Sequence, residues 1–226
     1  MTATIEQAGV VTTRLTGPGR TVARRMVKAW EAPVFHLGVD VDMTEALAVK
    51  GSGEGVTVSD VLLVACATAL RAHPRLNAWY DDESVSVVND VNVGLAVATD
   101  AGLVVPVVRQ VDTLDLNGVA AARRDVVDRA RAKKLTMADV TGGTFTVSNL
   151  GMLGIDEFDA ILNVPQVAIL AVSSTRMQQV WAPEAPEWKP IARFTLTCDH
   201  RAVDGATGAQ FLAGLRSELE RASHAG

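Results

Sequence analysis

Cysteine is scarce in this sequence, and no stretch of it looks like a targeting or membrane segment. The 226 residues include two cysteines, Cys66 and Cys198, too far apart for a disulfide framework or a CxxC metal motif. The N-terminus has no basic region followed by a long apolar run, so we expect no signal peptide. Apolar runs such as VLLVACATAL are too short to cross a bilayer. These absences favour a reducing, cytoplasmic setting without membrane attachment.

The chain also has no excess of positive charge. It carries 21 Lys and Arg against 26 Asp and Glu, which gives a net charge of −5 and a pI of about 5.4. We therefore expect no nucleic-acid partner, although a local basic pocket for a phosphorylated cofactor is compatible with this balance. Apolar residues make up 48% and charged residues 21%, a globular composition.

Helical and extended patterns mix along the chain without strict βαβ order. Helical spacing predicts helices over residues 20–31, 59–73, 115–134 and 206–222, with a short one from Thr44. Ser59 is the expected N-cap of the helix over 59–73. Extended patterns predict strands over 34–42, 84–88, 91–99, 103–111, 142–151, 164–174 and 192–200, and 175–190 is typical of a surface hairpin. This mixture predicts an α/β sandwich with a mixed sheet. Residues 1–14 lack a clear period, so we expect a flexible lead before one domain over 15–226.

The segment with the densest set of potentially reactive side chains follows a predicted strand near the C-terminus. FTLTCDHRAVDG, residues 194–205, runs from an alternating apolar pattern into Cys198, Asp199, His200, Arg201 and Asp204. Strand ends and the loops after them are where rigid scaffolds place reactive groups. His200 suits a general base, because the pKa of imidazole lies near neutrality. An ordinary polar turn explains Asp199 and Arg201 equally well, and Asp204 is a good helix N-cap.

Two other interpretations of this corner are weaker. A zinc site needs three or four ligands, and no second histidine stands at ligand spacing, so we expect no metal. A nucleophilic pair of Cys198 and His200 is disfavoured, because residues i and i+2 of a strand have Cα atoms roughly 6.6 Å apart. Cys198 is therefore expected to pack in the core. His36, inside VFHLGVDVD, is expected to be a partly buried structural residue, with a pocket-facing role as the alternative.

A second polar corner is GGTFTVSNLGMLG, residues 142–154. Thr144, Thr146 and Ser148 alternate, so they share one face of the predicted strand. A structural ladder of hydroxyls is one interpretation. Alternatively, Ser148 stands at the strand end before Asn149, where its hydroxyl can donate to a developing oxyanion. The flanking residues are not a GxSxG elbow, so no nucleophilic serine is indicated.

These blocks, taken in order, resemble one family. HRAVDG fits the pattern HxxxDG, and it follows GGTFTVSNLGMLGIDEFDAILNVPQVAILAV, GLAVATDAGLVVPVVR, and RTVARRM with PVFHLGVDVDMTEAL. Over roughly residues 15–222 the chain resembles the catalytic core domain of the dihydrolipoamide acyltransferase component of 2-oxo acid dehydrogenase complexes. The resemblance implies a chloramphenicol acetyltransferase-like two-layer sandwich, with a mixed β-sheet covered by helices.

The resemblance also implies a chemistry. An acyl group would move between a dihydrolipoyl thiol and coenzyme A by direct thiol attack, with His200 as general base and Ser148 as oxyanion donor. Asp204 would order the site through an arginine, and Asp199, Arg201 and Asn149 would support it structurally. Family members trimerise with the active site between subunits, so His200 and Ser148 would come from different chains of a homotrimer.

Three departures from the family pattern shape the remaining expectations. No lipoyl or peripheral subunit-binding domain is present, so the lipoyl group is expected in trans, from a lipoyl-bearing protein or other components of such a complex. The basic pair that opens the family's first helix reads Gly19-Arg20 here, which makes Arg20 the nearest candidate partner of Asp204. The C-terminal LERASHAG lacks the apolar knob that joins trimers into a cage, so we expect a trimer and no cage.

Two alternatives stay open from the sequence. One is a coenzyme A-dependent acyltransferase with a different acceptor, such as an amine, a hydroxyl or another carrier thiol. The other is a non-catalytic trimeric scaffold subunit. Neither the acyl group nor the residues that contact coenzyme A are specified by one sequence.

Overall fold

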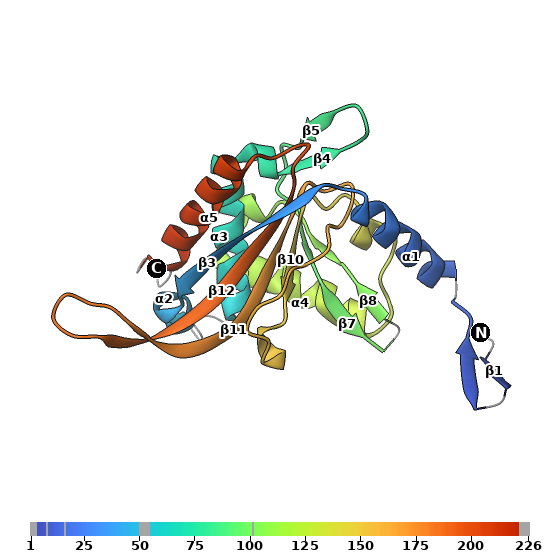
Figure 1. Ribbon diagram of the computed structural model, residues 1–226, viewed down its shortest axis with the longest axis horizontal. Helices are drawn as coiled ribbons and strands as arrows, with labels where there is room; N and C mark the ends of the chain where they lie inside the picture. Colours follow the sequence, from blue (N-terminus) through green and yellow to red (C-terminus); the bar gives the residue numbers. More distant parts are fainter. Residues whose placement is uncertain (1–3, 8, 16, 50–54, 101, 222–226) are drawn as a thin grey trace.

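A mixed six-stranded sheet forms the centre of the molecule. The computed structural model describes residues 4–7, 9–15, 17–49, 55–100 and 102–221. The strand order is β3 (Val34–Asp42), β12 (Glu187–Asp199), β11 (Ala168–Val180), β10 (Phe145–Asn149), β6 (Val93–Leu95) and β9 (Val107–Val108) (Figure 1). Strand β10 runs parallel to β11 and β6, and the remaining pairs are antiparallel. The expected mixed sheet is confirmed.

One face of this sheet is covered by helices. These are α3 (Val58–Ala72), α4 (Leu116–Arg131) and α5 (Gly205–Leu219), with the short α2 (Thr44–Ala48) beside them (Figure 1). Alternating side chains of the strands meet them, and Phe145, Phe194 and Phe211 are fully buried in the resulting core. Burying each such side chain contributes roughly 1.5–3 kcal/mol. The helices thus hold β10 and β12, which end in the two polar corners, as one rigid body.

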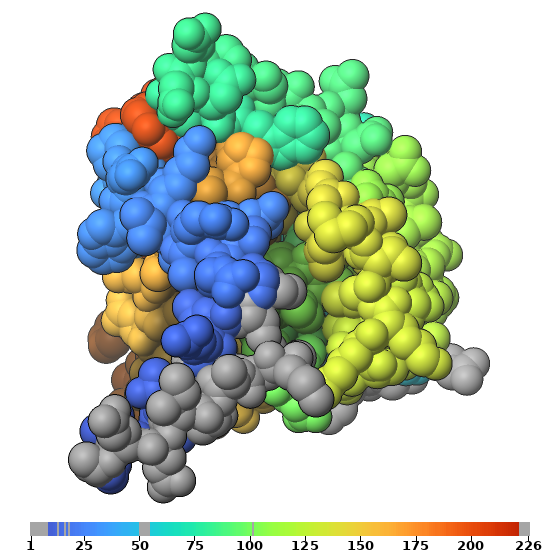
Figure 2. Space-filling view, turned by 90° about the vertical axis from the view of Figure 1, so that its right-hand side faces the viewer, coloured from blue at the N-terminus to red at the C-terminus, as the bar shows by residue number. Residues whose placement is uncertain are grey.

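Helix α1 (Gly17–Trp30) stands apart from this core. Its apolar residues lie on one side, as the spacing predicts, yet Val27 is 65% exposed and Trp30 is 79% exposed. Figure 2 shows α1, in blue, on the outer surface of the molecule. An isolated helix of this length is marginal in water. The apolar side of α1 therefore needs a surface that a single chain does not supply.

Three hairpins lie outside the central sheet. They are β1 (Thr4–Gln7) with β2 (Val10–Thr13), β4 (Ala78–Tyr80) with β5 (Val85–Val87), and β7 (Val97–Thr99) with β8 (Gly102–Val104). The first lies within the N-terminal lead, where no strand was predicted. Short β-prone runs flank Gly9, whose φ of 80° suits the turn between them. The expected hairpin around 175–190 is confirmed, because β11 and β12 continue as a ribbon beyond the sheet.

Short 3₁₀ turns complete the described fold, and no described helix has the length and apolar content needed to cross a membrane. The turns are η1 (Pro74–Leu76), η2 (Val111–Thr113), η3 (Ala138–Val140) and η4 (Gly151–Leu153).

The start of α3 differs from the predicted one, because Thr57 rather than Ser59 is its N-cap. The backbone N–H of Thr57 donates to Asp60 Oδ2 at 2.8 Å, which closes a capping box. The glycine-rich loop over 50–54 and the tail from 222, on which the cage expectation depends, lie outside the described residues.

Candidate active site

His200 stands immediately after β12, before α5 begins. Its backbone N–H donates to the carbonyl oxygen of Pro33 at 2.9 Å, which ties the corner to the start of β3. The imidazole lies beside the ring of Phe35, with 4.6 Å between ring centroids, and the residue is exposed. The ring is thus packed on one side and open on the other, as a base that must reach a substrate proton requires.

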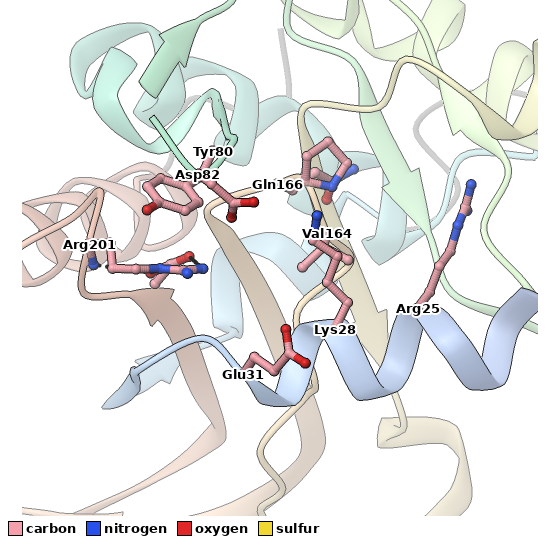
Figure 3. Close-up of a pocket in the computed structure, with 10 residues that line it drawn as sticks. Arg25, Lys28, Glu31, Tyr80, Asp82, Val164, Gln166 and Arg201 are labelled. Carbon is pink, nitrogen blue, oxygen red and sulfur yellow. Dashed lines mark hydrogen bonds and ion pairs between the residues drawn. The ribbon is translucent and has the colours of Figure 1, made fainter. Parts of the chain in front are cut away.

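Asp199 and Arg201 form a structural pair around this base. The Asp199 carboxylate is 2% exposed and accepts from Arg201 Nε at 2.9 Å and from Nη2 at 2.7 Å. Figure 3 shows the guanidinium of Arg201 against the ring of Tyr80, and its carbon Cζ lies 4.0 Å from the ring centroid. Fork-like pairing and ring contact fix both side chains. The pair is thus held rigidly on either side of His200 in the sequence.

Asp204 caps helix α5. Its Oδ1 accepts from the backbone N–H of Thr207 at 2.7 Å, and this hydrogen bond lowers the pKa of the Asp204 carboxyl below its ordinary value. Arg20, the candidate partner from the sequence, instead donates to the carbonyl oxygen of Leu15 at 2.9 Å. Within one chain, over the described residues, the ion pair between Arg20 and Asp204 is not formed. Helix α1 projects away from the core and carries Arg20 with it (Figure 1).

Ser148 is the penultimate residue of β10, and its hydroxyl is unengaged. The Thr146 hydroxyl donates to Gln166 Oε1 at 2.6 Å, and the Thr144 hydroxyl donates to the carbonyl oxygen of Asn92 at 3.1 Å. These two threonines bond to neighbouring segments and not to Ser148, so the three hydroxyls do not form one ladder along β10. Among the described residues, Ser148 Oγ has no hydrogen-bond partner. A half-buried hydroxyl without a structural bond is free to donate to a substrate.

Asn149 shapes the turn that follows. Its Oδ1 accepts from the backbone N–H of Gly151 at 2.8 Å. A Cβ at Gly151 would lie 2.7 Å from the carbonyl oxygen of Ser173, so the chain can pass there only as glycine. The turn holds the end of β10, and hence Ser148, against β11.

Ser148 opens onto a cavity of about 340 Å³. The cavity lies between α3, α4, the β7–β8 hairpin and the corner after β10, and most of its wall is apolar. Its lining residues are Ser59, Leu62, Leu63, Leu95, Ala96, Val97, Ala98, Leu103, Arg123, Val127, Arg131, Val147, Ser148, Asn149, Leu150, Met152 and Leu153. An apolar hollow with a few polar groups is the usual form of a small-molecule site.

Strand register keeps His200 and Ser148 apart within one chain. Ser148 pairs with Ala171 of β11, and Ala171 pairs with Thr195 of β12, five residues before His200. That offset is about 16 Å along the strands, with about 10 Å more across two strand spacings, so the two residues lie roughly 19 Å apart. Because β10 is parallel and β12 antiparallel to β11, their C-terminal ends lie at opposite ends of the sheet. One chain cannot bring both side chains to one substrate atom.

Cys198 and His36 complete the residues singled out from the sequence. Cys198 is fully buried, and burial, with Asp199 nearby, raises the pKa of its thiol to about 12. Such a thiol is inert at neutral pH, so packing is confirmed as its role. The side chain of His36 is 38% exposed, with Nδ1 2.9 Å from Thr197 Oγ1, and it lines a cavity of about 510 Å³, as the pocket-facing alternative expects. An outward position on the edge strand β3 explains this.

A further hollow of about 260 Å³ lies behind the pair of Asp199 and Arg201. Figure 3 shows Lys28 and Glu31 of α1 reaching toward it from below. Side chains of both charges line this hollow. The basic ones are Arg25, Lys28 and Arg201, and the acidic ones are Glu31, Asp82 and Asp199. This balance gives the hollow no net preference for an anion or a cation.

Comparison with known proteins identifies the family. The model for the 2-oxoacid dehydrogenases acyltransferase (catalytic domain) matches residues 7–225. The chain belongs to this family. It is 33% identical over 211 residues to the dihydrolipoyllysine-residue acetyltransferase component of the pyruvate dehydrogenase complex of Rickettsia bellii, covering 89% of this chain and 50% of that protein. The chain spans about half the length, or less, of the first curated relatives it matches.

Solved structures agree with this family. A structure from Listeria monocytogenes, described as a probable dihydrolipoamide acetyltransferase, has a TM-score of 0.91 at 30% identity and covers 96% of this chain and 97% of its own. The dihydrolipoamide acetyltransferase of Azotobacter vinelandii has a TM-score of 0.87 at 33% identity and covers 97% and 92%. Chloramphenicol acetyltransferase, at 13% identity and a TM-score of 0.60, shares the fold alone. The expected fold class is confirmed.

The Azotobacter structure bears directly on the site. It belongs to an investigation of a serine, a histidine and an asparagine in that enzyme's catalytic mechanism, where the serine precedes the histidine by 52 positions and the asparagine follows it by four. Ser148, His200 and Asp204 have the same separations in this chain. The third position differs, since an aspartate stands here in place of the asparagine.

Sequence reasoning missed the residues that form the cavity at Ser148. Arg123, Val127 and Arg131 are spaced i, i+4 and i+8 on α4, a spacing that places them on one helical face. The spacing of these residues can be recognised in the sequence, but there it indicates the solvent-exposed face of an amphipathic helix. Only the packing of the β7–β8 hairpin against α4 turns it into a wall of a cavity.

Proposed function

We propose that this chain is a dihydrolipoamide acyltransferase core that moves an acyl group between a dihydrolipoyl thiol and coenzyme A. One observation supports this most strongly. His200 is exposed, and the Ser148 hydroxyl has no hydrogen-bond partner among the described residues. The two residues are separated in the sequence by the same number of positions as the serine and the histidine studied in the Azotobacter enzyme. Family membership and the acetyltransferase relatives point to the same reaction.

The chemistry follows from the two side chains. His200 takes the proton of the incoming thiol, and the thiolate attacks the thioester carbonyl carbon. The Ser148 hydroxyl donates a hydrogen bond to the oxyanion of the tetrahedral intermediate. Collapse of the intermediate expels the other thiolate, which receives the proton back from the imidazolium of His200. No acyl-enzyme forms, in keeping with a buried Cys198 and an unpaired Ser148 that has no adjacent base in its own chain.

The reaction requires a second copy of the chain. His200 and Ser148 lie roughly 19 Å apart in one subunit, so the base of one subunit must meet the hydroxyl of its neighbour. A homotrimer with the site between subunits satisfies this requirement, and the exposed apolar side of α1 offers a contact surface. One related structure is the cubic core of the pyruvate dehydrogenase multienzyme complex. Whether trimers of this chain assemble further depends on a tail outside the described residues.

The lipoyl group is proposed to arrive in trans, on a lipoyl-bearing protein. A reducing cytoplasm suits two separate buried thiols. The scaffold alternative gains no support, because a scaffold needs neither a free hydroxyl at Ser148 nor an exposed base at His200. The curated relatives are dihydrolipoyllysine-residue acetyltransferases and give no support to an amine or hydroxyl acceptor.

The proposed function is tested by substituting the base. Purified protein is incubated with acetyl-, propionyl-, succinyl- or branched acyl-coenzyme A and dihydrolipoamide, and thioester formation is followed. Removing a general base costs about 10²–10⁴-fold in rate, so H200A should lower kcat by that factor. Because His200 is exposed, the melting temperature should be unchanged. Equal rates for wild type and H200A with every donor would show that the proposed function is wrong.

A further inference from the structure

Two buried hydroxyls near Ser148 have no hydrogen-bond partner in the fold. Among the buried side-chain nitrogen and oxygen atoms of the described residues, three lack a partner, and two of these are Ser173 Oγ and Thr195 Oγ1. Both residues are only 3% exposed. We propose that Ser173 and Thr195 hold ordered water inside the protein, and that this water positions the Ser148 hydroxyl. The inference rests on the proposed function and adds two positioning residues to it.

The strand register gathers these hydroxyls around Ala171. Ser148 of β10 and Thr195 of β12 both pair with Ala171, from its two sides. Ser173 follows Ala171 by two residues on β11, and Val172 between them packs in the core under the helices. Paired residues share one face of a sheet, and so do residues two apart on one strand. The three hydroxyls therefore lie on the face away from the helices, around a side chain that is a single methyl group.

The segment between β10 and β11 is tied to this part of the sheet. The backbone N–H of Ser174 donates to the carbonyl oxygen of Ile155 at 2.7 Å, and the Ser174 hydroxyl donates to the same oxygen at 2.8 Å. Phe158, further along the segment, packs against the apolar cluster that contains Ala171. Enclosed polar groups are nearly always hydrogen-bonded, either to protein or to ordered water. Since no described protein group serves Ser173 and Thr195, water is the partner that remains.

The spacing of the three residues suits bridges made of water. Ser173 lies one strand over and two residues along from both Ser148 and Thr195, which places their Cα atoms about 8 Å apart. Water that bonds to two hydroxyls joins oxygens up to about 5.6 Å apart, twice a usual O–H···O distance. The Cβ atoms of such diagonal pairs are closer than their Cα atoms, which brings the hydroxyl oxygens within this range.

Ordered water at this place fixes the Ser148 side chain in one rotamer. A hydroxyl has one donor and two acceptor lone pairs, so Ser148 can accept from the water and still donate to the oxyanion. Without that bond a serine samples three staggered χ1 positions, of which one aims at the oxyanion. Holding this rotamer raises kcat by up to about threefold and leaves substrate binding unchanged. Ser173 and Thr195 are positioning residues, because they act through Ser148.

Thermal unfolding tests the water through the sign of an effect. T195V replaces the hydroxyl with a methyl group of similar size. If water bonds to Thr195, T195V should lower the melting temperature by about 2–4 °C, whereas loss of a hydroxyl without a partner would raise it. In the T195V background S173A should cost nothing further, because the shared water is already lost. In the control background T197V it should cost as much as alone, because Thr197 Oγ1 is bonded to His36.

Kinetics and a crystal structure test the positioning role. The kcat of T195V should fall about threefold, with the KM for both thiol substrates unchanged, and T195S, which keeps the hydroxyl, should restore it. A high-resolution crystal structure should show water within hydrogen-bonding distance of Ser173 Oγ and Thr195 Oγ1 in wild type, and none there in T195V.

The outcomes separate this proposal from the proposed function. A higher melting temperature in T195V, or additive losses in the double variant with S173A, would overturn the water site. Coupled thermal losses with an unchanged kcat would overturn the positioning role and leave the function standing. If wild type itself transfers no acyl group, the proposed function fails, and the thermal cycle and the crystal structure still decide whether Ser173 and Thr195 hold water.

Discussion

The two polar corners of this molecule are built in opposite ways. At the His200 corner every neighbouring charge has a partner: Asp199 is paired with Arg201, and Asp204 caps α5. The base itself is exposed, it lies beside the ring of Phe35, and it lines none of the cavities described above. At the Ser148 corner the hydroxyl is half-buried and lines a formed, mainly apolar cavity, but no base stands near it.

The difference teaches that each corner lacks what the other has. The His200 corner supplies a base but lines none of the described cavities. The Ser148 corner supplies an oxyanion donor and a cavity but no base, so the two corners together make one complete site. Both lie on the same rigid sheet, so no modest motion of a loop can close the roughly 19 Å between them. Under the proposed function, association of subunits completes the site, and the single chain holds each half in place without joining the two.

The Ser148 half is tested by comparing two hydroxyls of β10. S148A should lower kcat by about 10²–10³-fold, because one oxyanion donor is lost, while the melting temperature stays near that of wild type. T146A should do the reverse. It leaves Gln166 Oε1 without its donor in the core, which costs about 1–3 kcal/mol of stability, and it leaves the chemistry intact. Kinetics and thermal unfolding of both variants check this, and a kcat loss of similar size in both would contradict a special role for Ser148.

Substitutions of Asp204 test the His200 corner, and we expect them to change stability and activity less than the substitutions above. D204A removes the cap of α5 and should lower the melting temperature, whereas D204N keeps an N-cap and should lower it less. D204N should also keep most of the activity, since the Azotobacter enzyme has an asparagine at the matching separation.

The contribution of Asp204 should depend on pH in a defined direction. The hydrogen bond from Thr207 lowers the pKa of this carboxyl below 3.8, so its stabilising effect is present above about pH 4 and is lost as the pH falls through the lowered pKa. Thermal unfolding between pH 2 and pH 7 checks this. The difference between wild type and D204A should narrow toward the acidic end, and a gap that stays constant would contradict the account.

Much of each corner could be predicted from sequence, because its signals are local. Alternating residues placed Ser148 at a strand end, and HRAVDG placed His200 and Asp204 between a strand and a helix. The distance between the corners was not accessible from the residues alone. It depends on β10 running parallel and β12 antiparallel to β11, and these pairings join segments far apart in the chain. Similarly, helical spacing in α1 predicted an apolar side but could not say that this side would be left exposed.

The cap of α3 shows a different limit. Thr57 and Ser59 are both good N-caps and lie two residues apart, so propensity alone does not choose between them. Asp60 decides, because it stands three residues after Thr57 and bonds back to its N–H. That spacing is visible in the sequence, and this error was avoidable.

Mixing the two inactive variants tests the central claim most directly. H200A and S148A chains, with different affinity tags, are co-expressed and the mixed oligomers are purified through both tags in turn. In a cyclic oligomer each interface pairs one subunit's base with its neighbour's hydroxyl, so random assembly restores about one quarter of the sites. The account predicts activity near that fraction of wild type in the unselected mixture, and a comparable recovery in doubly tagged oligomers. If the mixed oligomers are as inactive as either parent variant, His200 and Ser148 of one site come from the same chain. That result would contradict the claim that the site lies between subunits.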